Sequence, residues 1–178
     1  MRHTPVDEAN PISDASARSM PLAELAECHL GDPLVPGHTM SFAYAQRIDE
    51  SESFPHEAIH SLYQHRFQRY FVPGELGGSF RSFVELGELI RVLSRRDLTC
   101  SVAFSTLFWS FLTWMEGSAE QKRFLADFIL RREGAMCLAY SEKTHGSDLL
   151  GGDTVARRVP DGFLVSGEKW PINRATVS

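Results

Sequence analysis

The sequence contains little cysteine and no cysteine pattern. Only Cys28, Cys100 and Cys137 occur in 178 residues. An odd number without metal-ligand spacing predicts neither a disulfide framework nor a zinc site, and we assign no metal ligand. We expect the three side chains to behave as small buried hydrophobic groups in a reducing compartment, which favours a cytoplasmic location.

An excess of positive charge is also missing. Lysine and arginine number 18 against 23 aspartate and glutamate residues, for a net charge of -5. No basic stripe is available for a nucleic-acid backbone, so we expect no nucleic-acid partner. The first 21 residues are polar, contain three prolines and lack the apolar core of a secretory signal. Residues 1–18 are predicted to be disordered.

Long hydrophobic runs are scarce. Only residues 98–115 continue for 18 positions without a charged side chain, and six of those positions are Ser or Thr. The run is long enough to span a membrane by length alone. Neighbouring amphipathic patterns favour a helix buried in a bundle instead, so we expect no membrane span.

Helical spacing dominates residues 19–134. Pro55 can open one helix, and Ser79 can cap another over residues 80–95 with Phe83 facing inward. Gly117 is expected to end the apolar helix in a left-handed conformation. Ser118 and Gln121 form a capping-box pattern at the start of the next helix. The helices are predicted over residues 22–28, 40–50, 55–70, 80–95, 98–115 and 118–132.

The pattern changes after residue 134. Residues 135–140 form a short apolar run typical of a buried strand, and strands are predicted over 154–159 and 163–170, joined by a three-residue loop at 160–162. The fold class is α+β: a helical bundle domain at residues 19–134, then the first strands of an incomplete β-barrel domain at residues 135–178. Two or three strands cannot close a barrel, so we expect a truncated chain.

Residues 138–148 are the most informative segment. A strand-like run ends at Ser141, and a polar loop follows. Gly146 and Ser147 can present consecutive backbone N–H groups to an anionic oxygen such as a phosphate, and Asp148 can cap the loop backbone. The alternative is an ordinary connection between strands.

Five segments follow one another in an order that is itself informative. Phe-Pro at residues 54–55 opens a helix. Val-Pro-Gly-Glu-Leu-Gly-Gly at 72–78 is similar to the loop Pro-Glu-Glu-Tyr-Gly-Gly, and Gly-Ser-Ala-Glu-Gln-Lys at 117–122 is similar to Gly-Thr-Glu-Glu-Gln-Lys. Ser-Glu-Lys-Thr-His-Gly-Ser-Asp at 141–148 resembles Thr-Glu-Pro-x-Ala-Gly-Ser-Asp, and Asp-Gly-Phe-Leu-Val-Ser-Gly-Glu-Lys at 161–169 resembles Asp-Gly-Tyr-x-Leu-Asn-Gly-x-Lys. In this order, the five segments resemble the N-terminal part of the acyl-CoA dehydrogenase family of flavoproteins.

The resemblance implies a flavoprotein of fatty acid metabolism. FAD would lie between a middle β domain and a C-terminal helical bundle. A carboxylate would remove the α proton of an acyl thioester of CoA or a carrier protein while the β hydride passes to FAD. An electron-transfer acceptor and a homo-oligomer are further implied for a complete protein. The cofactor-binding residues implied by the motif match are Leu138, Tyr140, Ser141, Gly146, Ser147, Pro171, Ile172 and Asn173, with Ser147 also near the substrate.

Several residues depart from the family pattern. Pro171 stands where the family has a tryptophan that packs on the flavin, and Trp170 would point to the opposite face of a regular strand. Lys143 replaces a proline, and could favour a reduced anionic flavin or be a solvated loop residue. His145 replaces a small residue and is expected to be structural or exposed rather than catalytic. Glu142 is expected to be structural.

No catalytic residue is assigned, because the family's base lies in its C-terminal domain. The chain alone is expected to bind FAD weakly or not at all and to be inactive. Two alternatives remain open: a flavin-dependent monooxygenase on the same scaffold, and a non-enzymatic helical interaction module.

Overall fold

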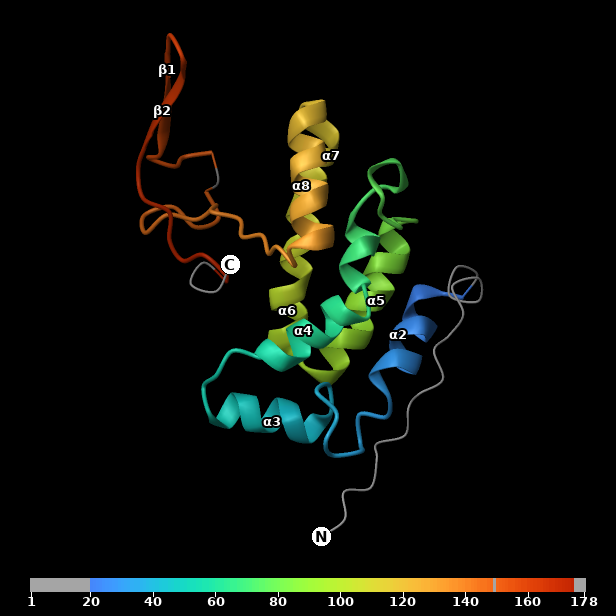
Figure 1. The fold of residues 1–178 in the computed structure, drawn as a ribbon. Coiled ribbons are helices and arrows are strands. Elements are labelled where there is room, and N and C mark those ends of the chain that lie inside the picture. The colour runs from blue at the N-terminus through green and yellow to red at the C-terminus, as the bar shows by residue number, and fades with distance from the viewer. Residues whose placement is uncertain (1–19, 149, 175–178) are drawn as a thin grey trace.

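A computed structural model describes residues 20–148 and 150–174. The predicted disordered N-terminus at residues 1–18 lies outside them. The helical part contains α2 (Leu22–Leu30), α3 (Phe42–Glu50), α4 (His56–Gln64), the 3₁₀ turns η1 (Phe67–Phe71) and η2 (Gly74–Leu76), α5 (Phe83–Arg96), α6 (Leu98–Ser105), η3 (Thr106–Trp109), α7 (Ser110–Glu116) and α8 (Ala119–Arg131). Strands β1 (Val155–Val159) and β2 (Gly162–Ser166) form an antiparallel hairpin. The predicted α+β class is confirmed, with the hairpin standing away from the helices (Figure 1).

Side-chain caps fix where several helices begin. Ser41, Ser82 and Asp97 each accept a hydrogen bond from the backbone N–H three residues later. The predicted capping box is confirmed: Ser118 Oγ accepts from Gln121 N, and Gln121 Oε1 accepts from Ser118 N. The predicted cap at Ser79 is wrong, because α5 begins at Phe83 behind Ser82.

Aromatic side chains form the centre of the core. The Phe104 side chain is fully buried and meets Phe71 edge to face at 5.6 Å and Tyr63 at 5.7 Å between ring centroids. Ser110 Oγ and Trp114 Nε1 both donate to the carbonyl oxygen of Phe71, at 3.3 and 2.9 Å. The core therefore joins η1 to α6 through aromatic contacts, and η1 to α7 through a carbonyl oxygen that accepts two hydrogen bonds.

A buried ion pair joins α2 to α5. The Arg96 side chain is 1% exposed and donates to Glu27 and to the carbonyl oxygen of Gly31. Arg95 also pairs with Glu27. The last turn of α5 thus carries two basic residues, Arg95 and Arg96, which share the Glu27 carboxylate as a partner.

The apolar run at 98–115 is only partly buried. The helical run Leu98–Glu116 is long and apolar enough to cross a membrane by length and composition, with 39% of its most apolar window buried. It packs on α5, α4 and α8, but Leu98, Leu112 and Met115 are exposed. A tighter 3₁₀ turn, η3, separates α6 from α7. The run therefore packs within the helical bundle as predicted, but it is divided by a 3₁₀ turn and part of its surface is exposed.

Other local expectations also differ from the structure. Gly117 is extended rather than left-handed, and an added Cβ would lie 2.6 Å from the Thr113 carbonyl oxygen. Phe83 is 58% exposed, although its ring still meets Phe80 and Phe111. Of the cysteines, only Cys100 is buried; the other two, Cys28 and Cys137, are exposed free thiols.

The β part is smaller than expected. Residues 135–140 are not a strand, because no neighbouring strand pairs with them within the described residues. Ser166 pairs with Val155 and Gly162 with Val159, which leaves a two-residue loop at 160–161 instead of the predicted three. Gly162 has φ +148°, a value that favours glycine at this turn.

Two histidines in the helical part should make stability depend on pH. The His29 and His65 rings lie 4.7 Å apart. Burial lowers the pKa of both from 6.5, and the His29 charge lowers the pKa of His65 further. The unfolded chain therefore binds more protons, and stability falls as pH drops below 6.5.

We expect His65→Gln to reduce the dependence of the melting temperature on pH in this range. The exposed His56→Gln control should keep the wild-type slope; equal slopes for all three proteins would contradict the assignment.

Candidate functional site

Glu142 holds the predicted cofactor-binding segment to the hairpin. Its side chain is 4% exposed. Oε2 accepts from Asp153 N at 2.6 Å, and Oε1 accepts from Thr154 N at 3.0 Å. Oε1 also accepts from Lys169 Nζ at 2.7 Å. One carboxylate therefore fixes the chain before β1 and the chain after β2.

These contacts decide the ionisation of Glu142. The Lys169 ammonium, followed by the Thr154 hydroxyl and the Asp153 N–H, lowers the pKa of Glu142 to about 2. A carboxylate with so low a pKa is a poor proton acceptor near neutral pH. The interpretation of Glu142 as a structural residue is thus confirmed by its contacts.

The two segments that the resemblance singles out lie side by side. The backbone N–H of Trp170 donates to the carbonyl oxygen of Ser141 at 2.8 Å. Lys169 Nζ donates to the carbonyl oxygen of Tyr140 at 3.1 Å. Residues 140–141 therefore lie beside residues 169–170, which lead into residues 171–173, although Ser141 and Trp170 are 29 positions apart in sequence.

The predicted cofactor-binding side chains are accessible. Tyr140, Gly146, Ser147, Pro171 and Asn173 are exposed. Leu138, Ser141 and Ile172 are half-buried. Space within 4 Å of a Cβ at Gly146 is empty. Within residues 20–148 and 150–174, the hydroxyls of Ser141 and Ser147 bond to no protein group. Two free donors beside an open glycine fit the polar edge of a flavin nucleotide.

The loop itself is closed by its backbone. Glu142 N donates to His145 O at 2.9 Å, and His145 N donates to Glu142 O at 3.2 Å. In the described part of the chain, the Asp148 carboxylate meets the His145 ring at 3.5 Å rather than a loop N–H. The expected capping of the loop backbone by Asp148 is therefore not seen, and its carboxylate contacts the His145 ring instead.

Two departures from the family pattern can now be placed. Lys143 Nζ lies 2.8 Å from Glu168 Oε1 in an exposed ion pair, so its charge is already matched. Trp170 is 57% exposed and lies outside any strand, so the alternation rule of a regular strand does not apply to it. Pro171 follows it, and the indole of Trp170 is accessible beside the position of the family tryptophan.

Arg174 was not singled out by the sequence. Its Nη1 donates to the carbonyl oxygen of Ala103 at 2.9 Å, and its guanidinium lies 5.7 Å from the Phe54 ring centroid. A pocket of about 470 Å³ lies beside these contacts and is lined in part by Leu98, Val102 and Asn173. No motif marked Arg174, because a basic residue after a strand candidate is a common pattern.

Removing the Glu142 charge should loosen this region locally. In Glu142→Gln, one amide must replace a carboxylate that accepts three hydrogen bonds. We expect the Asp153 and Thr154 amides to exchange with solvent at least about ten times faster, because charged acceptors bind N–H groups most strongly. Hydrogen exchange with mass spectrometry measures this effect.

Lys143→Gln is the matched control for that experiment. It removes the adjacent charge, whose ion pair with Glu168 is exposed and contributes little. Unchanged exchange in Glu142→Gln, or equal acceleration in both variants, would contradict the role assigned to Glu142.

Comparison with known proteins agrees with the resemblance. Residues 40–133, more than half of the chain, match the family described as "Acyl-CoA dehydrogenase, N-terminal domain". A 3-(aryl)acrylate reductase of Clostridium sporogenes is 30% identical over 138 residues, which are 75% of this chain and 36% of the relative. A benzylmalonyl-CoA dehydrogenase of Aromatoleum aromaticum is 29% identical over the same shares.

A probable acyl-CoA dehydrogenase of Mycobacterium bovis is 32% identical over 134 residues, covering 73% of this chain and 34% of the relative. The chain thus spans about a third of the length of the curated relatives it matches. The family match covers the helices that support the candidate site, from Met40 to Glu133. The chain belongs to the acyl-CoA dehydrogenase family, as a counterpart of its N-terminal region.

Proposed function

We propose that this chain supplies one wall of an FAD site in a protein that oxidises the α,β carbon–carbon bond of an acyl thioester. The observation that carries the proposal is the hydrogen bond from Trp170 N to Ser141 O. It joins the two segments that resemble the family's flavin-contacting motifs. Because the chain belongs to this family, we infer the same role for these segments. Residues 19–134 would be the supporting helical domain and 135–178 the start of the β domain.

Each predicted residue has a physical role in this proposal. Leu138, Tyr140, Pro171 and Ile172 offer apolar or backbone surface to the ring system. The hydroxyl of Ser141 and the amide of Asn173 donate hydrogen bonds to polar ring atoms. Gly146 and Ser147 offer a close backbone approach and a hydroxyl to the pyrophosphate or to the thioester. When bound, FAD supplies the capacity to accept a hydride.

The proton-abstracting base is assigned to none of the described residues. Glu142 is the carboxylate nearest the motif, but it accepts hydrogen bonds from Asp153, Thr154 and Lys169, which make it a poor proton acceptor. An electron-transfer acceptor, a homo-oligomer and a cytoplasmic location belong to the same proposal. The three free cysteines are compatible with a reducing compartment.

Flavin binding and turnover test the proposal. The complete reading frame that encodes this chain is expressed and titrated with FAD, and an acyl-CoA is added without oxygen. We expect the flavin absorption to bleach on addition of the thioester. Oxygen consumption with an external reductase, without bleaching by acyl-CoA, would instead support the monooxygenase alternative and contradict our proposal. The family match does not favour that alternative or a non-enzymatic module.

Serine variants locate the site within the same protein. Ser141→Ala and Ser147→Ala should each weaken FAD binding roughly five- to ten-fold, the value of one hydrogen bond. The exposed Ser53→Ala, on the connection between α3 and α4, is the control and should bind FAD normally. Equal affinities in all three variants would remove this segment from the flavin site.

A further inference from the structure

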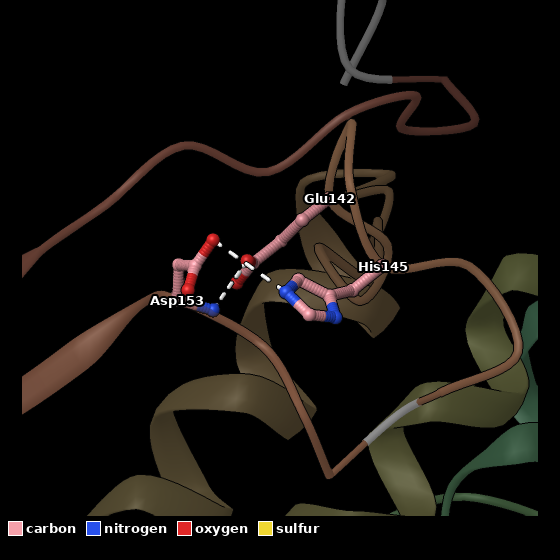
Figure 2. Close-up of side chains that lie close together, drawn as sticks. All are labelled: Glu142, His145 and Asp153. Atoms are coloured by element: carbon pink, nitrogen blue, oxygen red, sulfur yellow. Dashed lines mark hydrogen bonds and ion pairs between the residues drawn. The ribbon is translucent and has the colours of Figure 1, made fainter.

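Three side chains around the Glu142 contact converge on one point. Glu142, His145 and Asp153 each offer one ligand atom, and these atoms lie within 4.8 Å of one another. Figure 2 shows the imidazole of His145 and the carboxylate of Asp153 directed toward the Glu142 carboxylate. Glu142 and His145 come from the loop after Ser141, and Asp153 comes from the chain just before β1. The cluster therefore joins two segments that are also connected by hydrogen bonds of Glu142 and Thr144.

The spacing suits a small divalent ion. Zinc binds imidazole nitrogen and carboxylate oxygen at roughly 2.0–2.2 Å, so two ligand atoms in a tetrahedral site lie about 3.4 Å apart. His145 Nε2 and Asp153 Oδ2 are 3.5 Å apart. The Asp153 side chain is 77% exposed and can move without disturbing a packed core. All three ligand atoms lie within 4.8 Å of one another, so a bound ion would have to draw them closer together.

The groups behind the three side chains match the usual surroundings of a metal ligand. His145 Nδ1 lies 3.5 Å from Asp148 Oδ2, and such a carboxylate orients the imidazole and directs its other nitrogen to a metal. Backbone N–H groups hold the Glu142 carboxylate in place. Thr144 Oγ1 donates to Asp153 Oδ2 at 3.3 Å. Each of the three side chains is therefore oriented by at least one further contact within the chain.

The charges around His145 also favour the binding of a cation. Three carboxylates, those of Glu142, Asp148 and Asp153, surround the imidazole, and Lys169 supplies one ammonium on the Glu142 side. The three carboxylates outnumber the one ammonium, and a divalent ion would balance the excess negative charge.

We propose that Glu142, His145 and Asp153 bind a divalent transition-metal ion, with zinc as the expected one, and that Asp148 positions His145. Three protein ligands leave a fourth position for water. The ion would clamp the loop at residues 142–148 to the chain before β1. This site goes beyond the proposed flavin function and does not depend on it.

Metal titration of the chain tests the site. Exposed thiols compete for zinc, so the experiment uses the Cys28→Ser, Cys137→Ser background, treated with a chelator and dialysed. Zinc is added in a calorimeter, and cobalt is added as a visible absorption probe. We expect one equivalent to bind, and zinc to slow hydrogen exchange over residues 142–148. Binding of magnesium as tight as that of zinc would overturn the proposal.

Matched histidine variants identify the ligands. His145→Ala and His145→Gln should each weaken zinc binding more than about ten-fold, and Asp148→Asn about 10- to 100-fold through the orientation of His145. His60→Ala is the control, because His60 Nδ1 lies 3.2 Å from Glu133 Oε2 in an exposed pair that belongs to no three-residue cluster in the described chain.

Circular dichroism of each variant establishes that it is folded before titration. Unchanged affinity in both His145 variants, or an equal loss in His60→Ala, would overturn the assignment. A loss confined to the His145 variants and Asp148→Asn would support it. Absence of zinc binding to the parent protein would also overturn the proposal.

Discussion

Gly78→Ala is expected to unfold the helical part of the chain under conditions in which the parent chain is stable. A Cβ at Gly78 would lie 1.9 Å from the carbonyl oxygen of Val72 and 2.4 Å from its carbonyl carbon. Those atoms are backbone and cannot rotate away. The same turn is closed by hydrogen bonds from Gly78 N to Pro73 O and from Phe80 N to Val72 O. Moving the backbone far enough to relieve the contact would break this turn. We therefore expect the free energy of unfolding to fall by at least about 3 kcal/mol.

Gly74→Ala is the matched control, four residues earlier in the same loop. No heavy atom lies within 4 Å of a Cβ at Gly74. We expect the free energy of unfolding of Gly74→Ala to lie within about 0.5 kcal/mol of that of the parent chain. Urea unfolding followed by circular dichroism measures both variants. Similar midpoints for the two variants would show that the loop can open at Gly78 without cost.

Phe104→Ala should lower the free energy of unfolding by about 3–5 kcal/mol, the range for truncating a buried phenylalanine to alanine. The side chain is fully buried and touches the rings of Tyr63 and Phe71 edge to face. Such ring pairs add about 0.5–1.5 kcal/mol each beyond the buried area. The loss therefore includes a cavity and two aromatic contacts that join α6 to α4 and η1.

Phe124→Ala gives the comparison for this second variant. Phe124 is 63% exposed and stacks only on Phe128 in the described part of the chain. We expect it to change the free energy of unfolding by less than about 1 kcal/mol. Equal losses for Phe104→Ala and Phe124→Ala would mean that the ring cluster around Phe104 is not the centre of the core.

Local sequence signals predicted the helical part well. The capping box at Ser118 depends on two residues three positions apart, which the sequence displays directly. Burial was predicted less well, as Phe83 and Leu112 show. Helical spacing identifies an apolar face, but which part of that face is covered depends on distant helices. The expected left-handed Gly117 is extended because the chain turns directly into the Ser118 cap.

The β part shows the limit of periodicity. Residues 135–140 have the apolar run of a buried strand, yet a strand forms only when another strand accepts its hydrogen bonds. The hairpin was predictable because both of its strands and its turn are local.

For the candidate site, the family motifs singled out Ser141 and the segment that follows β2, and the structure brings Ser141 next to Trp170; contact of these residues with a flavin stays a prediction. The partners of Glu142 were not predicted. Asp153 and Lys169 lie 11 and 27 residues away, and their contacts follow from how the hairpin folds back.

The bond from Tyr63 to Gly134 has a consequence for synthesis of the chain. Tyr63 Oη donates to the carbonyl oxygen of Gly134 at 3.0 Å in a buried position, just after α8 ends. The Glu27–Arg96 pair and the Phe71–Phe104 contact also lie within residues 20–134. Domains made first can fold first on the ribosome. We therefore expect the helices to pack as soon as Gly134 has emerged, before the hairpin exists, so that the nascent chain presents a finished scaffold to the segment carrying Ser141.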